Sequence, residues 1–142
     1  MNFADTTEPT PSAIEDLLAY ARTMRGPVQF LSFIRWRDGA LDALRPSGSR
    51  IPSPEALAAY RRWRELSDPI VRQCGGQLSV MYRRAVTLVE PQLEWDVMAI
   101  AAYPDVKDLI AVLHRMDMLD ALPHRRLSMA WCSVVVCETY TY

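Results

Sequence analysis

The spacing of apolar residues along the chain predicts an ordered series of strands and helices. Residues 28–36 (VQFLSFIRW) are rich in β-branched and aromatic residues, and both alternating sides of this stretch are largely apolar. A strand that is apolar on both sides is covered on both sides, so we expect it to be central in its sheet. The predicted strands span 28–36, 77–84, 95–103 and 127–137, and the predicted helices span 12–24, 54–74 and 105–117.

Capping residues, prolines and glycines indicate where these elements begin and end. Ser12 and Glu15 have the spacing of a capping box, and Ser53-Pro54 is typical of a helix start. Pro69 is expected to kink or split the second helix. Residues 37–52, which contain glycine, proline and serine, predict the longest loop, and a short segment through Leu122-Pro123 is expected to lead into the last strand.

After the first helix, the predicted order is β-α-β-β-α-β, which indicates the α+β class. This order is that of the ferredoxin-like motif, with one antiparallel four-stranded sheet and two helices on one face. A chain of 142 residues has the usual size of one domain. We therefore predict a leader and helix over 1–25, a ferredoxin-like domain over 26–138 and a tail over 139–142.

Two helices cannot cover both faces of such a sheet. The uncovered face is expected to carry apolar side chains, and an apolar face of this size marks an interface. The sequence therefore predicts a homodimer in which the two sheets face one another. The residues expected there are Val28, Phe30, Met81 or Tyr82, Met98 or Val97, and Trp131 or Cys132.

Composition narrows the classes of function. The formal net charge is −1 and the pI is about 6.1, which argues against a nucleic-acid-binding domain. No stretch approaches the run of about 20 apolar residues that crosses a membrane. The N-terminal residues do not resemble a secretory signal and the three cysteines are an odd number, so we expect a cytoplasmic protein with free thiols. Cys132 and Cys137 are expected on opposite faces of one strand.

Common catalytic and nucleotide-binding motifs are missing from the sequence, and the two histidines and three cysteines form no recognisable metal-ligand pattern. We therefore expect neither a metal nor a cofactor.

Three residues are candidates for a catalytic role. His124 and Arg125 stand before the last predicted strand, where His124 is a candidate acid–base group or a loop cap, and Arg125 could orient an anionic substrate. Asp96 shares a strand face with apolar residues, so it is either ion-paired with Arg35 or Arg125 or a general base.

Five further residues are candidates for lining a substrate pocket. Ser32 is a polar residue within an apolar strand, and such a break in pattern is where function tends to appear. Tyr60 lies on the inner side of the second predicted helix, where a core role is the alternative. The five candidates are Ser32, Arg35, Tyr60, Trp95 and Tyr103.

The order of several segments resembles the DUF1330 family of the dimeric α/β-barrel superfamily. The segments are PVQFLSFIRWRDG at 27–39, the helix containing Tyr60, Cys74-Gly75-Gly76, WDVMAIAAYP at 95–104 and PHRRLSMA at 123–130. The resemblance covers about residues 26–137. This chain departs from the family pattern at two places. The family has an Asn near the position of Ser32, and it has a run of small residues after the position of Arg125.

The resemblance implies a ferredoxin-like fold that dimerises through its sheets and has a mostly apolar pocket between sheet and helices. Fold alone does not select a reaction, because the superfamily includes several chemistries. The first hypothesis is a cofactor-independent isomerase, cyclase or lyase acting on an apolar, carbonyl-bearing metabolite, for example one of natural-product biosynthesis. The alternatives are a non-catalytic dimeric module that binds a ligand or a partner, and a cofactor-free monooxygenase. A haem enzyme is the least favoured hypothesis.

Overall fold

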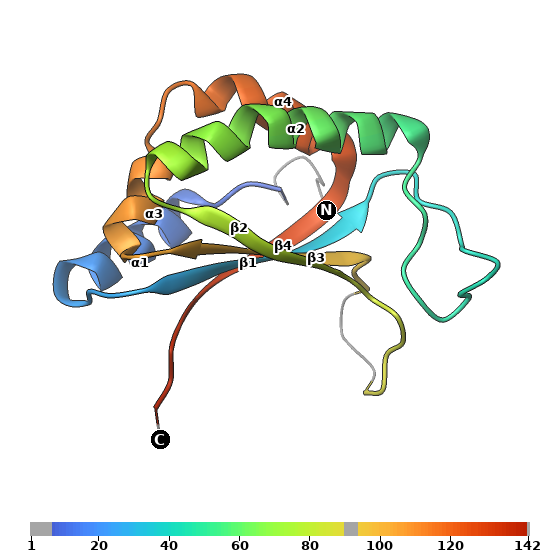
Figure 1. The fold of residues 1–142 in the computed structure, drawn as a ribbon, viewed down its shortest axis with the longest axis horizontal. Coiled ribbons are helices and arrows are strands. Elements are labelled where there is room, and N and C mark those ends of the chain that lie inside the picture. Colours follow the sequence, from blue (N-terminus) through green and yellow to red (C-terminus); the bar gives the residue numbers. More distant parts are fainter. Residues whose placement is uncertain (1–6, 90–93, 142) are drawn as a thin grey trace.

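The chain folds into one antiparallel sheet with helices layered on one side of it (Figure 1). The computed structural model describes residues 7–89 and 94–141. The α+β class and the order of strands along the chain agree with the prediction. The elements are α1 (Pro11–Thr23), β1 (Val28–Trp36), α2 (Pro54–Gln73), β2 (Gln77–Arg83), β3 (Val97–Tyr103), α3 (Val106–Leu113), α4 (Met118–Ser128) and β4 (Met129–Glu138).

The strands lie in the order β2-β3-β1-β4, so β1 is central as predicted. It pairs with β3 through partners such as Ser32 and Ala99, and with β4 through partners such as Ser32 and Val134. Alternation along β1 sends Val28, Ser32 and Ile34 to the helix side, where they are buried. The register therefore fixes which side chain of every strand faces the helices.

The apolar core forms two clusters near opposite ends of the inner sheet face. One joins Val28 of β1 to Val106 and Leu109 of α3. The other joins Ile34 of β1 to residues that include Tyr60 of α2. Between these clusters, the inner positions of the two central strands carry the small side chains of Ser32 and Ala99 (8% exposed each), which are direct partners across β1 and β3.

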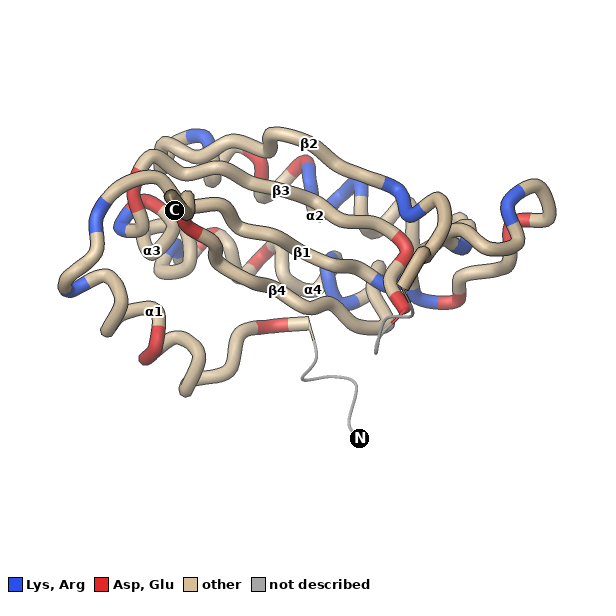
Figure 2. Tube along the Cα trace, turned by 90° about the horizontal axis from the view of Figure 1, so that it is seen from below, with Lys and Arg blue, Asp and Glu red and all other residues tan. Residues whose placement is uncertain are grey.

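The opposite face of the sheet has no helix of the described residues over it (Figure 2). In Figure 2 the four strands lie in front of α2 and α4, α1 lies beside the β4 edge, and the charged residues of the strands lie mainly at their ends. The expectation that Val28 and Phe30 lie on this face is wrong, because both lie on the helix side. Since β1 is apolar on both sides, its alternation alone does not say which side is open. Pairing places Leu31, Phe33, Val80, Tyr82, Met98, Ile100, Trp131 and Val135 on the open face.

Helix α2 differs from its prediction at Pro69. The helix begins after Ser53, whose side chain accepts a hydrogen bond from the Ala56 amide, and continues through Pro69 to Gln73. Pro69 is exposed, so the carbonyl that loses its partner can face solvent, and the buried residues on either side hold the helix together. The helix is therefore not split.

Helix α4 replaces the short connection expected before the last strand. It runs through Pro123, and its buried positions include Met118, Ala121, Arg125 and Ser128 at three- and four-residue steps. Because this buried stripe contains an arginine and a serine, its helical period is not visible as an apolar pattern. His124 and Arg125 consequently lie within a helix and not in a loop at a strand mouth.

Helix α1 and the long loop extend the basic motif. The N-cap of α1 is Thr10, not Ser12, and the side chain of Thr10 accepts a hydrogen bond from the Ala13 amide. The Tyr20 hydroxyl of α1 donates to the Glu138 carboxylate at the end of β4. Among the described residues, none of the helices is long and apolar enough to cross a membrane.

Candidate functional site

A cavity of about 250 Å³ lies between the inner sheet face and the helices. Its floor includes Ser32, Ala99 and Ala101, whose short side chains leave space that larger residues would fill. Ser67 of α2 also lines the cavity and is buried, so the helix above the sheet contributes a short side chain as well. The cavity therefore arises from small residues on facing elements, between the two apolar clusters of the core.

Most of the cavity lining is apolar, and its volume lies just below the range of about 300–1,000 Å³ that is typical of pockets for drug-sized ligands. Apolar walls come from Phe30 of β1, Val71 of α2 and Leu109 of α3. A cavity with such walls and a few polar groups is the usual form of a small-molecule site. The polar groups of the lining therefore decide which ligands or reactions the cavity can accommodate.

Arg125 is the buried cation of this cavity. Only 7% of the residue is exposed, and it lines the cavity from α4. Its Cζ lies 5.5 Å from the centroid of the Trp63 ring, and its Nη2 donates to the Cys132 Sγ at 3.1 Å. Among residues 7–89 and 94–141, no carboxylate lies within ion-pair distance of this guanidinium.

The neighbours of Arg125 that could become anions are held in their neutral forms. Burial raises the pKa of the Cys132 thiol above its ordinary 9.0, although the Arg125 charge partly opposes this. Burial likewise raises the pKa of the Tyr60 phenol, against the opposing effects of Arg64 and Arg125. Neither side chain supplies a negative charge to Arg125 at neutral pH.

The two carboxylates of the cavity lining are paired with other arginines. Asp68 accepts two hydrogen bonds from Arg64, at 2.8 Å from Nε and 2.9 Å from Nη2. Glu8 pairs with Arg126 of α4. Since Arg64 neutralises Asp68 and Arg126 neutralises Glu8, the charge of Arg125 is the one in the lining that no described residue compensates.

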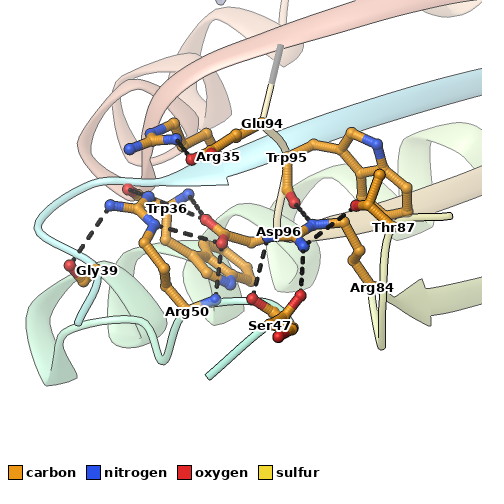
Figure 3. A network of polar contacts seen from close by, with 11 residues as sticks. Arg35, Trp36, Gly39, Ser47, Arg50, Arg84, Thr87, Glu94, Trp95 and Asp96 are labelled. Carbon is orange, nitrogen blue, oxygen red and sulfur yellow. Dashed lines mark hydrogen bonds and ion pairs between the residues drawn. The ribbon is translucent and has the colours of Figure 1, made fainter. Parts of the chain in front are cut away.

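Asp96 lies outside the cavity lining and has a different environment (Figure 3). It is 1% exposed, and its Oδ2 accepts from the Trp36 amide at 2.8 Å and from Arg50 Nη2 at 2.9 Å. Its Oδ1 accepts from the Arg50 amide at 2.8 Å. The expectation of an ion pair is confirmed, but the partner is Arg50 and not Arg35 or Arg125, because the loop 37–52 folds back over the start of β3.

The Asp96 network holds that loop in place. Arg84 donates to the carbonyls of Ser47 and Trp95, so the end of β2 is tied to both the loop and the segment before β3 (Figure 3). Since both carboxylate oxygens of Asp96 are occupied, neither is free to accept a substrate proton.

The eight predicted site residues separate into two groups. Ser32, Tyr60, Tyr103 and Arg125 all line the cavity. Burial raises the pKa of the Tyr103 phenol to about 12, so it remains protonated at neutral pH. Arg35, Trp95, Asp96 and His124 are not among the residues that line it.

Arg35 and Trp95 instead belong to the open side of the sheet. Arg35 forms an ion pair with Glu94 at 3.2 Å. Trp95 packs edge-on against Phe33, with the ring centroids 5.5 Å apart. The structure therefore brings four of the eight candidates together and leaves the other four elsewhere.

Sequence reasoning missed the cavity residues Ser67, Ala99, Arg64 and Asp68. Ser67 stands seven residues after Tyr60, which places both on one helix face, and Ala99 is an inner-face position of β3. Short side chains at such inward positions are the signal that could have located the cavity. In the part of the chain that the structure describes, no cluster of three or more histidine, cysteine or acidic side chains could hold a metal ion.

Comparison with known proteins supports the fold. No protein-family model and no curated protein sequence matches this chain. A crystal structure of methylated RPA0582 is similar, with 22% identity and a TM-score of 0.76, covering 96% of this chain and 97% of that one. Another structure of RPA0582, a protein of unknown function from Rhodopseudomonas palustris, gives 20% identity and a TM-score of 0.75, with 95% and 97% covered.

A third similar structure is a dimeric protein of unknown function with a ferredoxin-like fold from Bacteroides fragilis. It has 12% identity and a TM-score of 0.53, and the match covers 80% of this chain and 97% of that one. At these identities the likeness concerns the fold, and it confirms the ferredoxin-like class.

The Asp96 network predicts a large effect of one substitution. Asp96→Asn removes the charge opposite the partly buried Arg50 and should lower the free energy of unfolding by about 3 kcal/mol. Glu94→Gln is the matched control, because its ion pair with Arg35 is exposed and is worth less than about 1 kcal/mol. Urea unfolding of the three proteins at one protein concentration measures both values. A loss below about 1 kcal/mol for Asp96→Asn would contradict the structural role of the network.

Proposed function

We propose that this protein binds a small, mostly apolar organic molecule in the cavity between sheet and helices. The observation that carries the proposal is an apolar cavity, about 250 Å³ in volume, that contains the buried Arg125 guanidinium. A ligand in contact with Phe30 and Leu109 would remove further apolar surface from water. The hydroxyl groups of Ser32 and Ser67 would supply polar contacts.

Binding is better supported than a proton-transfer reaction. The two residues expected to move protons, His124 and Asp96, do not line the cavity. An isomerase, cyclase or lyase reaction in this cavity would therefore depend on the other polar groups of the lining. The cofactor-free monooxygenase and membership of DUF1330 stay predictions, as does the cytoplasmic location.

One observation keeps catalysis as a second candidate. The Tyr60 phenol lines the cavity, and its raised pKa keeps it protonated, so it could donate a proton or a hydrogen bond to a carbonyl oxygen. Recovery of the ligand after incubation with the protein separates the candidates. A chemically altered ligand would favour the enzyme, and an unchanged one favours binding alone.

We also propose that two copies associate through the open sheet faces. Apolar side chains cover this face, and Tyr82 and Val135 are 52% and 45% exposed in the single chain. An exposed apolar sheet face of this extent is typical of an interface. Dimeric proteins with this fold, such as those from Bacteroides fragilis and Thermobifida fusca, support the proposal.

Filling the cavity should abolish ligand binding without unfolding the protein. Ala99→Leu adds three carbon atoms to the cavity floor and should weaken the binding of neutral probes at least about tenfold. Suitable probes are octanamide, phenylacetamide and indole-acetamide, with affinity measured by isothermal titration calorimetry. Ala111→Leu is the matched control, because Ala111 is exposed on α3 and does not line the cavity.

Thermal unfolding distinguishes a filled cavity from an overpacked core. Ala99→Leu should unfold at or above the temperature of the original protein, because the new side chain occupies existing space. Unchanged probe affinity in Ala99→Leu would contradict the proposed function, and so would a wild-type protein that binds neither the three amides nor the corresponding acids.

The dimer proposal predicts that a charge on the open face produces monomers. Val135→Glu would bury an unpaired carboxylate near its symmetry mate, at a cost of several kcal/mol, and should raise the dimer Kd at least about 100-fold. Leu119→Glu, at an exposed position of α4, should leave the dimer intact. Light scattering after size-exclusion chromatography over a dilution series gives both masses. A monomeric original protein, or a Val135→Glu dimer of unchanged affinity, would refute this interface.

A further inference from the structure

Among the described residues, Arg125 is the charged group of the cavity lining that has no oppositely charged partner. A buried cation is stable in a protein when it is paired with an anion or otherwise solvated. Arg125 has the face of Trp63 at 5.5 Å and the neutral sulfur of Cys132 at 3.1 Å. The Trp63 ring restores part of the solvation energy that the guanidinium lost on burial, but it does not neutralise the charge.

The described chain offers no anion for this position. Asp68 and Glu8 are the acidic residues of the cavity lining, and each is engaged by another arginine, Arg64 and Arg126 respectively. Cys132 and Tyr60 carry raised pKa values and remain neutral at neutral pH. Because no described residue supplies this negative charge, a molecule that enters the cavity is the source that the geometry favours.

The geometry of the cavity limits this molecule further. Its walls are mostly apolar, and its volume is about 250 Å³. A highly charged phosphate ester would face these apolar walls with charges that one guanidinium cannot neutralise. A monocarboxylate with an alkyl or aryl body matches both features, because its planar carboxylate suits the guanidinium fork and its body suits the walls.

We infer that the ligand of this cavity is a small organic monocarboxylate whose carboxylate pairs with Arg125. The inference rests on the proposed binding function and names the ligand class for that same cavity. The body of the ligand would lie toward the floor formed by Ser32, Ala99 and Ala101. Arg125 would act as the residue that selects acids over neutral molecules of the same shape.

Matched acids and amides test the inference with the unaltered protein. Octanoate, phenylacetate and indole-acetate are compared by calorimetry with the corresponding amides, which have nearly the same shape and no charge. At least one acid should bind about tenfold more tightly than its amide, because a charge-assisted pair is stronger than a neutral hydrogen bond. Equal affinities within every pair, or tighter binding of the amides, would overturn the inference and leave the proposed cavity function standing.

A substitution then assigns the preference to Arg125. Arg125→Met retains much of the side-chain volume and removes the charge, so the preference for the acid should disappear while amide affinity stays within about threefold. Arg22→Met is the matched control, because Arg22 is exposed on α1 and does not line the cavity. A preference that persists in folded Arg125→Met would show that another group binds the acid. If Arg125→Met does not fold, Arg125→Gln, which also removes the charge, provides the same test.

If neither acids nor amides bind the unaltered protein, the proposed function itself fails. If amides bind and acids have no advantage, only the inference about the ligand class fails. The two failures are therefore distinguishable in one set of titrations.

Discussion

The Arg125 guanidinium stands where three elements of the fold meet. It belongs to α4, it packs over Trp63 of α2, and it bonds to Cys132 of β4. A cation at this junction cannot be covered as an apolar side chain would be, because its charge must remain in contact with polar groups or an anion. The packing of α2 and α4 over the sheet thus encloses a space with a charged wall, and the cavity and its proposed ligand depend on that charge.

Asp96 shows what a buried charge looks like when the chain itself completes its environment. Its two oxygens accept hydrogen bonds from the Trp36 amide and from the amide and guanidinium of Arg50. Those bonds join the end of β1, the loop 37–52 and the start of β3. Asp96 therefore has a structural role that accounts for its burial. Arg125 is also buried, but no described residue provides the negative charge that would balance it. This contrast is the reason for assigning a ligand to Arg125 and not to Asp96.

Much of the fold could be predicted from the sequence, because alternation in strands and helical spacing both report burial. The bounds 28–36 of β1 match the prediction, and the Ser53-Pro54 start of α2 does as well. Which side of β1 faces the open surface could not be predicted, so Val28 and Phe30 were wrongly expected there, because a strand that is apolar on both sides carries no signal for which side is covered. Helix α4 was missed for a related reason, since Arg125 and Ser128 occupy buried positions that would be apolar in an ordinary amphipathic helix.

Only part of the candidate site could be predicted. Ser32 attracts attention as a polar residue within an apolar strand, and Arg125 as a cation next to His124; both line the cavity. The positions that create the space, Ala99 and Ser67, are unremarkable in sequence and become informative only when the sheet and α2 face one another. The partner of Asp96 was not predictable either, because Arg50 reaches it through an irregular loop. Long-range charge pairs of this kind depend on tertiary folding, and no local pattern records them.

The central claim is that the carboxylate of a bound acid completes the environment of Arg125. A crystal structure of the protein with the tightest-binding acid tests this claim most directly. The account predicts carboxylate oxygens at about 2.7–2.9 Å from the Arg125 guanidinium, with the apolar body in the cavity between Ser32 and Ser67. An acid bound with its carboxylate away from Arg125, or bound outside this cavity, would contradict it.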